Sequence, residues 1–149
     1  MAERMSFEGR KVGAGTFAKM YLDGDHVFDL KSLETKLTID KEDVIQNGTR
    51  SKDTKQVTVG GEGTFVVHKI YTRGKELLDK YKSGKEVGFD NVLIKLEDPD
   101  MDGLESIEIK RISLDEFTLL SGENASLMEE EFPFTFNPDH IKYKDYISR

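Results

Sequence analysis

Alternation of apolar and polar side chains with a period of two residues is the feature that most limits the folds open to this chain. In its clearest form, Leu33, Thr35, Leu37 and Ile39 alternate with charged or polar neighbours, a pattern that gives a strand one buried and one solvated face. The same period recurs along the sequence, whereas the 3.6-residue period of amphipathic helices is nearly absent. We therefore predict a mainly β domain.

Further strands are predicted from this pattern and from the turn signals between them, over residues 16–22, 27–30, 56–71, 89–96, 106–120 and 132–136. Within residues 56–71, we expect a bulge or tight bend at Gly60, Gly61 and Gly63. The apolar phase of residues 106–120 changes twice, which predicts bulges or bends near residues 110–111 and 115–116. Residues 72–84 form the one predicted helix, because Thr72 can cap its start and Gly84 its end.

Residues 41–55 lose the alternation and are mostly polar or small, so we predict a long loop there. Loops of this length are usually functional or disordered. The predicted fold is a β-sandwich or barrel-like domain with one flanking α-helix and a long polar loop. With 149 residues, the chain is expected to form a single domain over residues 1–149, with an N-terminal arm over residues 1–12 and a C-terminal arm over residues 139–149.

The formal charge of −7 counts against binding to duplex DNA, which needs clustered Lys and Arg. The charge is uneven: it is 0 over residues 1–60, +2 over residues 61–96 and −9 over residues 97–149. The acidic residues either crowd the loops of this last third by chance or form a functional surface. The absence of Cys excludes disulfides and Cys-based zinc sites. Because no apolar stretch is long enough for a membrane span and the N-terminus is polar, we expect a protein of the reducing cytoplasm.

Residues 98–105 contain the pattern closest to a metal site. Asp98, Asp100 and Asp102 with the following glycine resemble the opening of an EF-hand calcium loop, but Ile109 stands where a bidentate Glu is needed. Glu105 could replace that Glu in a looser site. An acidic hairpin turn is the simpler interpretation.

Other residue types with chemical potential also lack a site pattern. The three histidines His26, His68 and His140 are far apart in sequence. Residues 60–64 are glycine-rich but lack the lysine of a phosphate loop. Residues 129–131 are three consecutive Glu, and adjacent positions of a strand point to opposite faces. We predict no catalytic residue, no metal and no cofactor.

A set of motifs spread from about Arg10 to Pro138 carries a family resemblance through its order and spacing, although no single motif is specific. The motifs are Gly15-Thr16-Phe17, Leu22-Asp23-Gly24, Glu34-Thr35-Lys36, Gly61-Glu62-Gly63-Thr64-Phe65, Val67-His68-Lys69-Ile70, Lys95-Leu96-Glu97-Asp98-Pro99-Asp100, Phe117-Thr118-Leu119 and Pro133-Phe134-Thr135-Phe136. In these segments the chain resembles the tail-tube proteins of contractile phages and defective prophages, particularly the tube family of the defective prophage of Bacillus.

The resemblance implies a structural subunit and not an enzyme. Its β-sandwiches would join around a six-fold ring, and the rings would stack into a tube inside a contractile sheath. The implied partners are further copies of the chain, the sheath protein, and baseplate and tape-measure proteins, with DNA passing through the lumen without specific binding if the particle is a phage. We expect assembly in the bacterial cytoplasm and then a place in a virion or a released tail-like particle.

The resemblance also suggests which residues serve assembly. Its long loop contacts neighbouring subunits, so the candidates for contacts between rings are Glu42, Asn47, Arg50, Lys52 and Asp53. The candidates for lumen charge are Glu105, Glu108, Asp115 and Glu116, although these carboxylates could equally lie on the outer wall. The alternative function is a monomeric β-sandwich binding module of unknown ligand. A hydrolase with dispersed carboxylates has no support from residue spacing.

Overall fold

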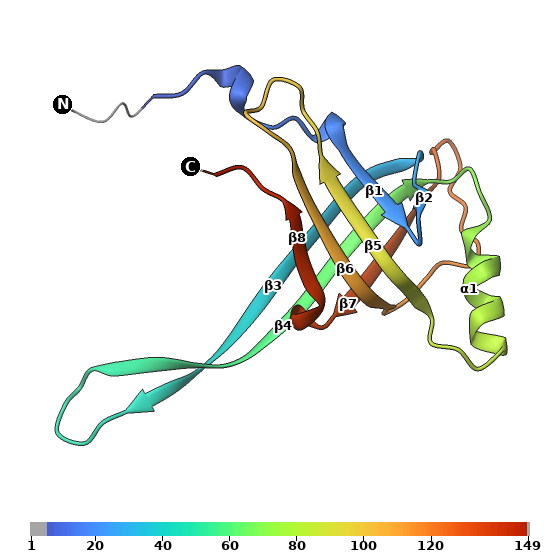
Figure 1. Cartoon of the computed structure of the whole chain (residues 1–149). Coiled ribbons are helices and arrows are strands. Elements are labelled where there is room, and N and C mark those ends of the chain that lie inside the picture. The colour runs from blue at the N-terminus through green and yellow to red at the C-terminus, as the bar shows by residue number, and fades with distance from the viewer. Residues whose placement is uncertain (1–5, 149) are drawn as a thin grey trace.

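The computed structural model describes residues 6–148 and is mainly antiparallel β (Figure 1). The strands are β1 (Ala18–Leu22), β2 (Asp25–His26), β3 (Leu30–Ile45), β4 (Lys52–His68), β5 (Gly88–Leu96), β6 (Glu105–Leu114), β7 (Glu129–Phe136) and β8 (Ile141–Asp145). The helices are α1 (Arg73–Lys82) and the short 3-10 turns η1 (Gly9–Lys11), η2 (Gly15–Phe17) and η3 (Pro138–His140). The predicted fold class is confirmed.

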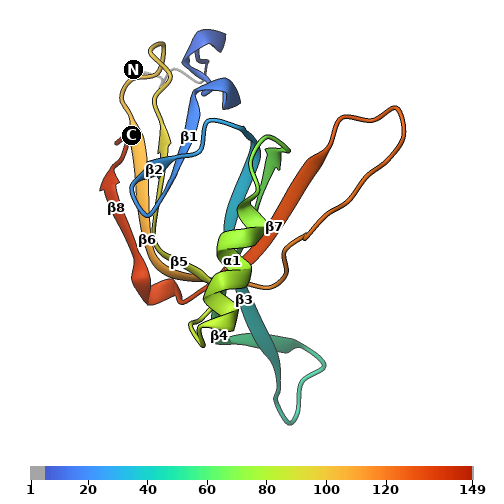
Figure 2. The ribbon, with the colours of Figure 1, turned by 90° about the vertical axis from the view of Figure 1, so that its right-hand side faces the viewer.

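Strand β6 joins two layers of the molecule. The strand order is β2-β1-β5-β6-β7-β4-β3, and β8 also pairs with β6. One edge of β6 pairs with β5, while the other pairs with β8 over residues 106–109 and with β7 only at residues 113–114. The layer of β1, β2, β5, β6 and β8 therefore faces the layer of β3, β4 and β7 (Figure 2).

The core lies between these layers and follows the predicted alternation. The β7 side chains Phe132, Phe134 and Phe136 are buried and point to one face of the strand, as the sequence predicts. Across from them, the other layer contributes buried residues such as Met20 and Val92. Each fully buried side chain of this size contributes about 1.5–3 kcal/mol to the free energy of folding.

Two glycines of β4, Gly61 and Gly63, make room for aromatic rings and do not mark a bulge. The register shifts between β3 and β4 fall between Leu30 and Ser32 and between Asp40 and Lys41 of β3, so the predicted bulge at the glycines is wrong. A Cβ atom on Gly61 would lie 2.4 Å from the ring of Phe136. A Cβ atom on Gly63 would lie 2.5 Å from the ring of Phe134 and 2.6 Å from the backbone oxygen of Glu34.

The predicted loop over residues 41–55 is instead the outer part of a long β-hairpin formed by β3 and β4. Strand β3 continues to Ile45 and β4 begins at Lys52, so only residues 46–51 form the loop. The hairpin projects beyond the two layers (Figure 1). Both of its faces are solvated, so its strands need no apolar alternation, and backbone hydrogen bonds hold the pair without a sequence signature.

Three smaller expectations have mixed outcomes. The turn at Asp23-Gly24 is confirmed, with positive φ at both residues, but its return strand is β2 instead of residues 27–30. The bend near residue 111 is confirmed by a φ of 59° at Arg111, whereas residues 115–120 are not a strand, because β6 ends at Leu114. The tail is not simply an arm, since β8 pairs with β6; residues 1–5 of the expected N-terminal arm lie outside the described residues.

The predicted helix is confirmed as α1, which lies at one end of the two layers (Figure 1), but the Thr72 side chain makes no capping hydrogen bond. Its side chain Leu77 is buried, and Gly84 follows its end with a φ of +77°. Its first residue, Arg73, donates from Nη2 to Asp29 Oδ1 at 2.6 Å and from Nη1 to the second carboxylate oxygen. The Asp29 side chain is only 1% exposed, so this bidentate pair fixes the helix to the segment before β3.

We predict that Gly63→Ala lowers the free energy of unfolding by about 1–3 kcal/mol, because the added methyl group would overlap the Phe134 ring and a backbone oxygen. The matched control is Gly60→Ala on the same strand, where a Cβ atom meets nothing within 4 Å. The control should change stability by less than about 1 kcal/mol. Urea denaturation of both variants measures the difference, and equal stabilities would contradict this role for Gly63.

We predict a stability that depends on the ionisation of Asp29. Burial raises the pKa of Asp29, but the hydrogen bond and the charge of Arg73 outweigh it, so the folded pKa lies below the ordinary 3.8. The carboxylate therefore contributes fully to stability above that value, and the contribution is lost as the pH falls through the lower folded pKa. Asp29→Asn should destabilise the fold at neutral pH by about 3 kcal/mol and flatten the acid limb of stability against pH. Denaturation from pH 7 downwards tests this, with Asp90→Asn as the exposed control.

Candidate assembly surfaces

The sheet of β3, β4 and β7 has two different unpaired edges. Strand β3 pairs with β4 on one side only, and within residues 6–148 no strand pairs with its other edge. Strand β7 pairs with β4 along its whole length but with β6 only at Phe134 and Thr135. Among residues 6–148, no strand pairs with residues 129–132 of β7 on that side. Unpaired edges of this kind are templates for pairing with another chain.

The long hairpin carries an exposed apolar stripe. Leu37, Ile39 and Val59 are each 45–47% exposed. They lie on the same face of the hairpin as the core-facing Gly61, because Leu37 pairs with Gly61 and Ile39 pairs with Val59. Where the hairpin leaves the body, an apolar cleft of about 360 Å³ opens between the two layers, lined by residues such as Leu37, Phe136 and Tyr143. This stripe and cleft are apolar surface that the described chain leaves uncovered.

The outer face of the β3-β4-β7 sheet is acidic. It carries Glu34, Asp40, Glu62 and Glu131 together with Lys36, and we call these five residues the acidic wall; Glu129 on the same face is paired with Lys31. The Lys36 ammonium lies 3.6 Å from Glu34 and 3.7 Å from Glu62, so a single cation is shared by two carboxylates. The sequence placed Glu34 and Lys36 on a solvated strand face. Only the pairing of β3, β4 and β7 brings their acidic neighbours to the same face.

The four predicted lumen residues do not form one surface. Glu105 and Glu108 are three positions apart on β6 and so point to opposite faces. Asp115 lies beside the acidic wall, where it lines the same hollow as Glu34 and Glu131, and Glu116 is an exposed residue after β6. The four residues share a stretch of sequence, and that stretch crosses from one layer to the other.

The carboxylate of Glu108 is bound within the chain. Its Oε2 lies 2.6 Å from Lys144 Nζ on β8, and its side chain is 11% exposed. The hydrogen bond from Lys144 lowers the pKa of Glu108 and outweighs burial, which raises this pKa. The charges of Lys144, Lys110 and Lys142 lower the pKa further.

The five predicted contact residues between rings do lie together at the far end of the hairpin. Glu42, Lys52 and Asp53 are on its paired strands, while Asn47 and Arg50 are in the loop at its tip. All five are exposed. Lys52 lies 3.4 Å from Asp43 across the hairpin, an exposed ion pair that contributes little to stability.

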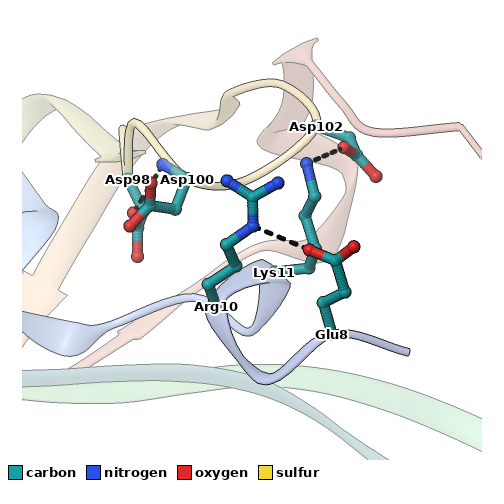
Figure 3. A network of polar contacts seen from close by, with 6 residues as sticks. All are labelled: Glu8, Arg10, Lys11, Asp98, Asp100 and Asp102. Carbon is teal, nitrogen blue, oxygen red and sulfur yellow. Dashed lines mark hydrogen bonds and ion pairs between the residues drawn. The ribbon is translucent and has the colours of Figure 1, made fainter. Parts of the chain in front are cut away.

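The loop with the calcium-like pattern uses its carboxylates to hold the N-terminal segment. Asp98, which is 6% exposed, accepts hydrogen bonds from Ala14 N at 3.0 Å and from Asp100 N at 2.9 Å. Asp102 lies at the other end of the loop, where it binds Lys11 at 2.8 Å (Figure 3). This hydrogen bond and the charge of Lys11 lower the pKa of Asp102. Among residues 6–148 no group of three His, Cys, Asp or Glu is arranged to hold a metal ion.

Comparison with known families gives the chain an identity. A family described as "Phage tail tube protein" matches residues 5–140. The chain belongs to the phage tail tube protein family. The resemblance read from the sequence motifs is thereby confirmed.

A curated relative covers nearly the whole tail tube chain. The phage-like element PBSX protein XkdM of Bacillus subtilis (strain 168) is 24% identical over 142 residues, which are 94% of this chain and 97% of the relative. In the described part of the chain, no helix has the length and apolar character needed to cross a membrane.

Two solved structures have the same fold at low sequence identity. A chain from the virion of a native gene transfer agent particle has a TM-score of 0.64 at 8% identity, covering 90% of this chain and 100% of that one. A chain from the sheath-tube complex of an extracellular contractile injection system, PVC, in its extended state has a TM-score of 0.61 at 11% identity, covering 87% and 88%.

We predict that Asp98→Ala destabilises this tail tube protein by about 1–3 kcal/mol, because it leaves two backbone N–H groups without their acceptor. The matched control is Asp102→Ala in the same loop, which removes only an exposed ion pair and should leave the unfolding midpoint unchanged. Thermal unfolding of both variants provides the measurement. A larger loss in the Asp102 variant would reverse our assignment of the two carboxylates.

Proposed function

We propose that this chain is a non-catalytic subunit that assembles with its own copies into stacked six-membered rings, and that the rings form the inner tube of a contractile tail within a sheath. The observation that carries the proposal is the pair of different free edges on one sheet, at β3 and at residues 129–132 of β7. A closed ring requires two different complementary surfaces on each subunit. Two unlike strand edges meet that requirement, and a pair of identical edges does not.

In the proposed ring, the free edge of β3 pairs with the free edge of β7 on the next subunit. This pairing satisfies backbone N–H and C=O groups that would otherwise meet only water, and it continues the β3-β4-β7 sheet around the ring. The six-fold count follows from the family resemblance. Sheath, baseplate and tape-measure partners are proposed on the same basis, as is assembly in the bacterial cytoplasm before incorporation into a virion or tail-like particle.

The hairpin joins successive rings in this proposal. Its stripe of Leu37, Ile39 and Val59 loses contact with water when a neighbouring subunit covers it, which contributes about 25 cal/mol for each Å² of apolar surface buried. The exposed polar residues at its tip, Asn47 and Arg50 among them, then lie against the next ring. The proposal thus keeps the predicted contact residues but gives them a paired hairpin as their support.

The acidic wall lines the bore in the proposed tube. In a ring whose β3-β4-β7 sheet is continuous, one face of the sheet packs against the core and only the face that points away from the core can line the bore. That face carries Glu34, Glu62 and Glu131. Carboxylates on a bore repel a phosphate backbone, so DNA could slide without binding, and ions would be the cargo of a bacteriocin-like particle. This set replaces Glu105 and Glu108 as the lumen candidates.

The proposed function predicts that shortening the hairpin abolishes tubes without unfolding the subunit. Replacing residues 41–57 by Asn-Gly connects the paired residues Asp40 and Thr58 through a two-residue turn. Stability should change by less than about 1 kcal/mol, because the removed segment lies outside the core. Negative-stain electron microscopy should reveal tubes for the unmodified chain, and single rings without tubes for the short one, because the β3 and β7 edges that close the ring are kept.

Light scattering over a wide concentration range is the second measurement. A persistent monomer in the unmodified protein, with baseplate components added, would overturn the tube and favour the monomeric binding module. A cryo-EM map of the tubes also tests the bore. Placement of Glu34, Glu62 and Glu131 on the outside would refute that assignment alone.

A further inference from the structure

The outer face of the second layer is basic, in contrast to the acidic wall. Five lysines from four strands point to this face, and we call them the basic wall: Lys19, Lys95, Lys110, Lys142 and Lys144. Lys19 pairs in register with Lys95, Asn91 with Lys110, and Glu108 with Lys142. The core residues Met20, Val92 and Ile109 occupy the alternate positions of β1, β5 and β6, so the lysines face away from the core.

The carboxylates that lie next to the lysines of the basic wall are already bound to groups of the same chain. Glu97 is shared by Lys19 at 3.4 Å and Lys95 at 3.8 Å. Glu108 binds Lys144, and Asp145 accepts a hydrogen bond from Ser106 Oγ at 2.8 Å. Lys110 and Lys142 are exposed, and in the described part of the chain neither forms an ion pair of its own. They are therefore the surplus positive charge of this surface.

Folding alone does not explain this concentration of lysine. Like charges directly opposite each other on antiparallel strands are destabilising, and Lys19 and Lys95 stand in that relation. The chain as a whole has a charge of −7, so a positive surface on it produces a field that attracts a negative partner. The lowered pKa of Glu108 is consistent with a positive potential at this face.

Two apolar side chains, Tyr21 and Leu93, lie among the lysines of the basic wall. Tyr21 and Leu93 pair in register next to the Lys19–Lys95 pair, Leu93 is followed across the sheet by Glu108 and then Lys142, and both apolar residues are half-buried. The Lys95 ammonium lies 5.5 Å from the centroid of the Tyr21 ring. Apolar side chains beside charged ones are typical of protein interfaces, whereas a phosphate backbone would make no use of the apolar part.

We infer that the basic wall is the docking surface for a carboxylate-rich surface of the protein that surrounds the tube. The inference rests on the proposed function. Because the two layers face each other, a tube with the acidic wall at its bore has the basic wall on its outside (Figure 2). The attraction then acts between the tube and its sheath, and not between subunits.

The test uses preformed tubes and the purified sheath protein of the same particle. Co-sedimentation at low and high salt measures binding to unmodified tubes, to Lys110→Gln/Lys142→Gln tubes and to a control, Lys75→Gln/Lys82→Gln, with the same charge change on α1. The wall variant should bind sheath about ten-fold more weakly at low salt and with a smaller salt dependence. The control should bind like the unmodified tubes.

Two results would overturn the inference. One is unchanged sheath binding and salt dependence in wall-variant tubes that electron microscopy finds to be normal. The other is loss of binding to duplex DNA, and not to sheath, in the wall variant, which would reassign the surface to nucleic acid.

A parallel measurement separates this inference from the proposed function. Binding of a poly-glutamate peptide to the unassembled subunit should weaken in the wall variant and not in the control. If no tubes form, the proposed function fails while this measurement still decides the charge of the docking surface. Equal peptide binding by all three proteins would count against the basic wall.

Discussion

The structure depends on the packing of the β7 phenylalanine row against β4 and the opposite layer. Phe132, Phe134 and Phe136 all point inward, and two of their rings occupy space that exists only because Gly61 and Gly63 lack side chains. Strand β7 pairs with β4 along its whole length, whereas it pairs with β6 of the other layer at only two positions. Side-chain packing, more than strand pairing, keeps the two layers together, and it fixes which face of each strand is left outside.

The edges left free by this arrangement link stability to assembly. Because β6 pairs with β7 at only two positions, residues 129–132 of β7 keep unpaired backbone groups on that side. Because the β3-β4 hairpin extends beyond the core, Leu37 and Ile39 stay exposed. Edge strands are commonly covered or charged, and β3 does carry charged side chains such as Lys31, Glu34 and Lys36. In the described chain these backbone groups and this apolar surface stay in contact with water, and in the proposed ring a second copy would cover them.

The distribution of charge follows the layers and not the order of residues. Residues 97–149 carry −9, yet β6 and β8 from this third supply three of the five lysines of the basic wall. The acidic wall draws Glu34 and Glu62 from the first half of the chain, which is close to neutral in total. Counting charges along the sequence therefore predicted lumen residues that the fold distributes over different faces.

The sequence by itself determined the fold class, the α1 helix, most strands and the family, because apolar periodicity, turn residues and motif spacing are local properties. It could not predict the long hairpin, since strands solvated on both faces carry no periodic signal. Nor could it predict the role of Gly61 and Gly63, the pairing of β8 with β6, or which carboxylates share a wall. Those features depend on register between distant strands, where a shift of one residue exchanges the two faces, and only the tertiary structure decides that register.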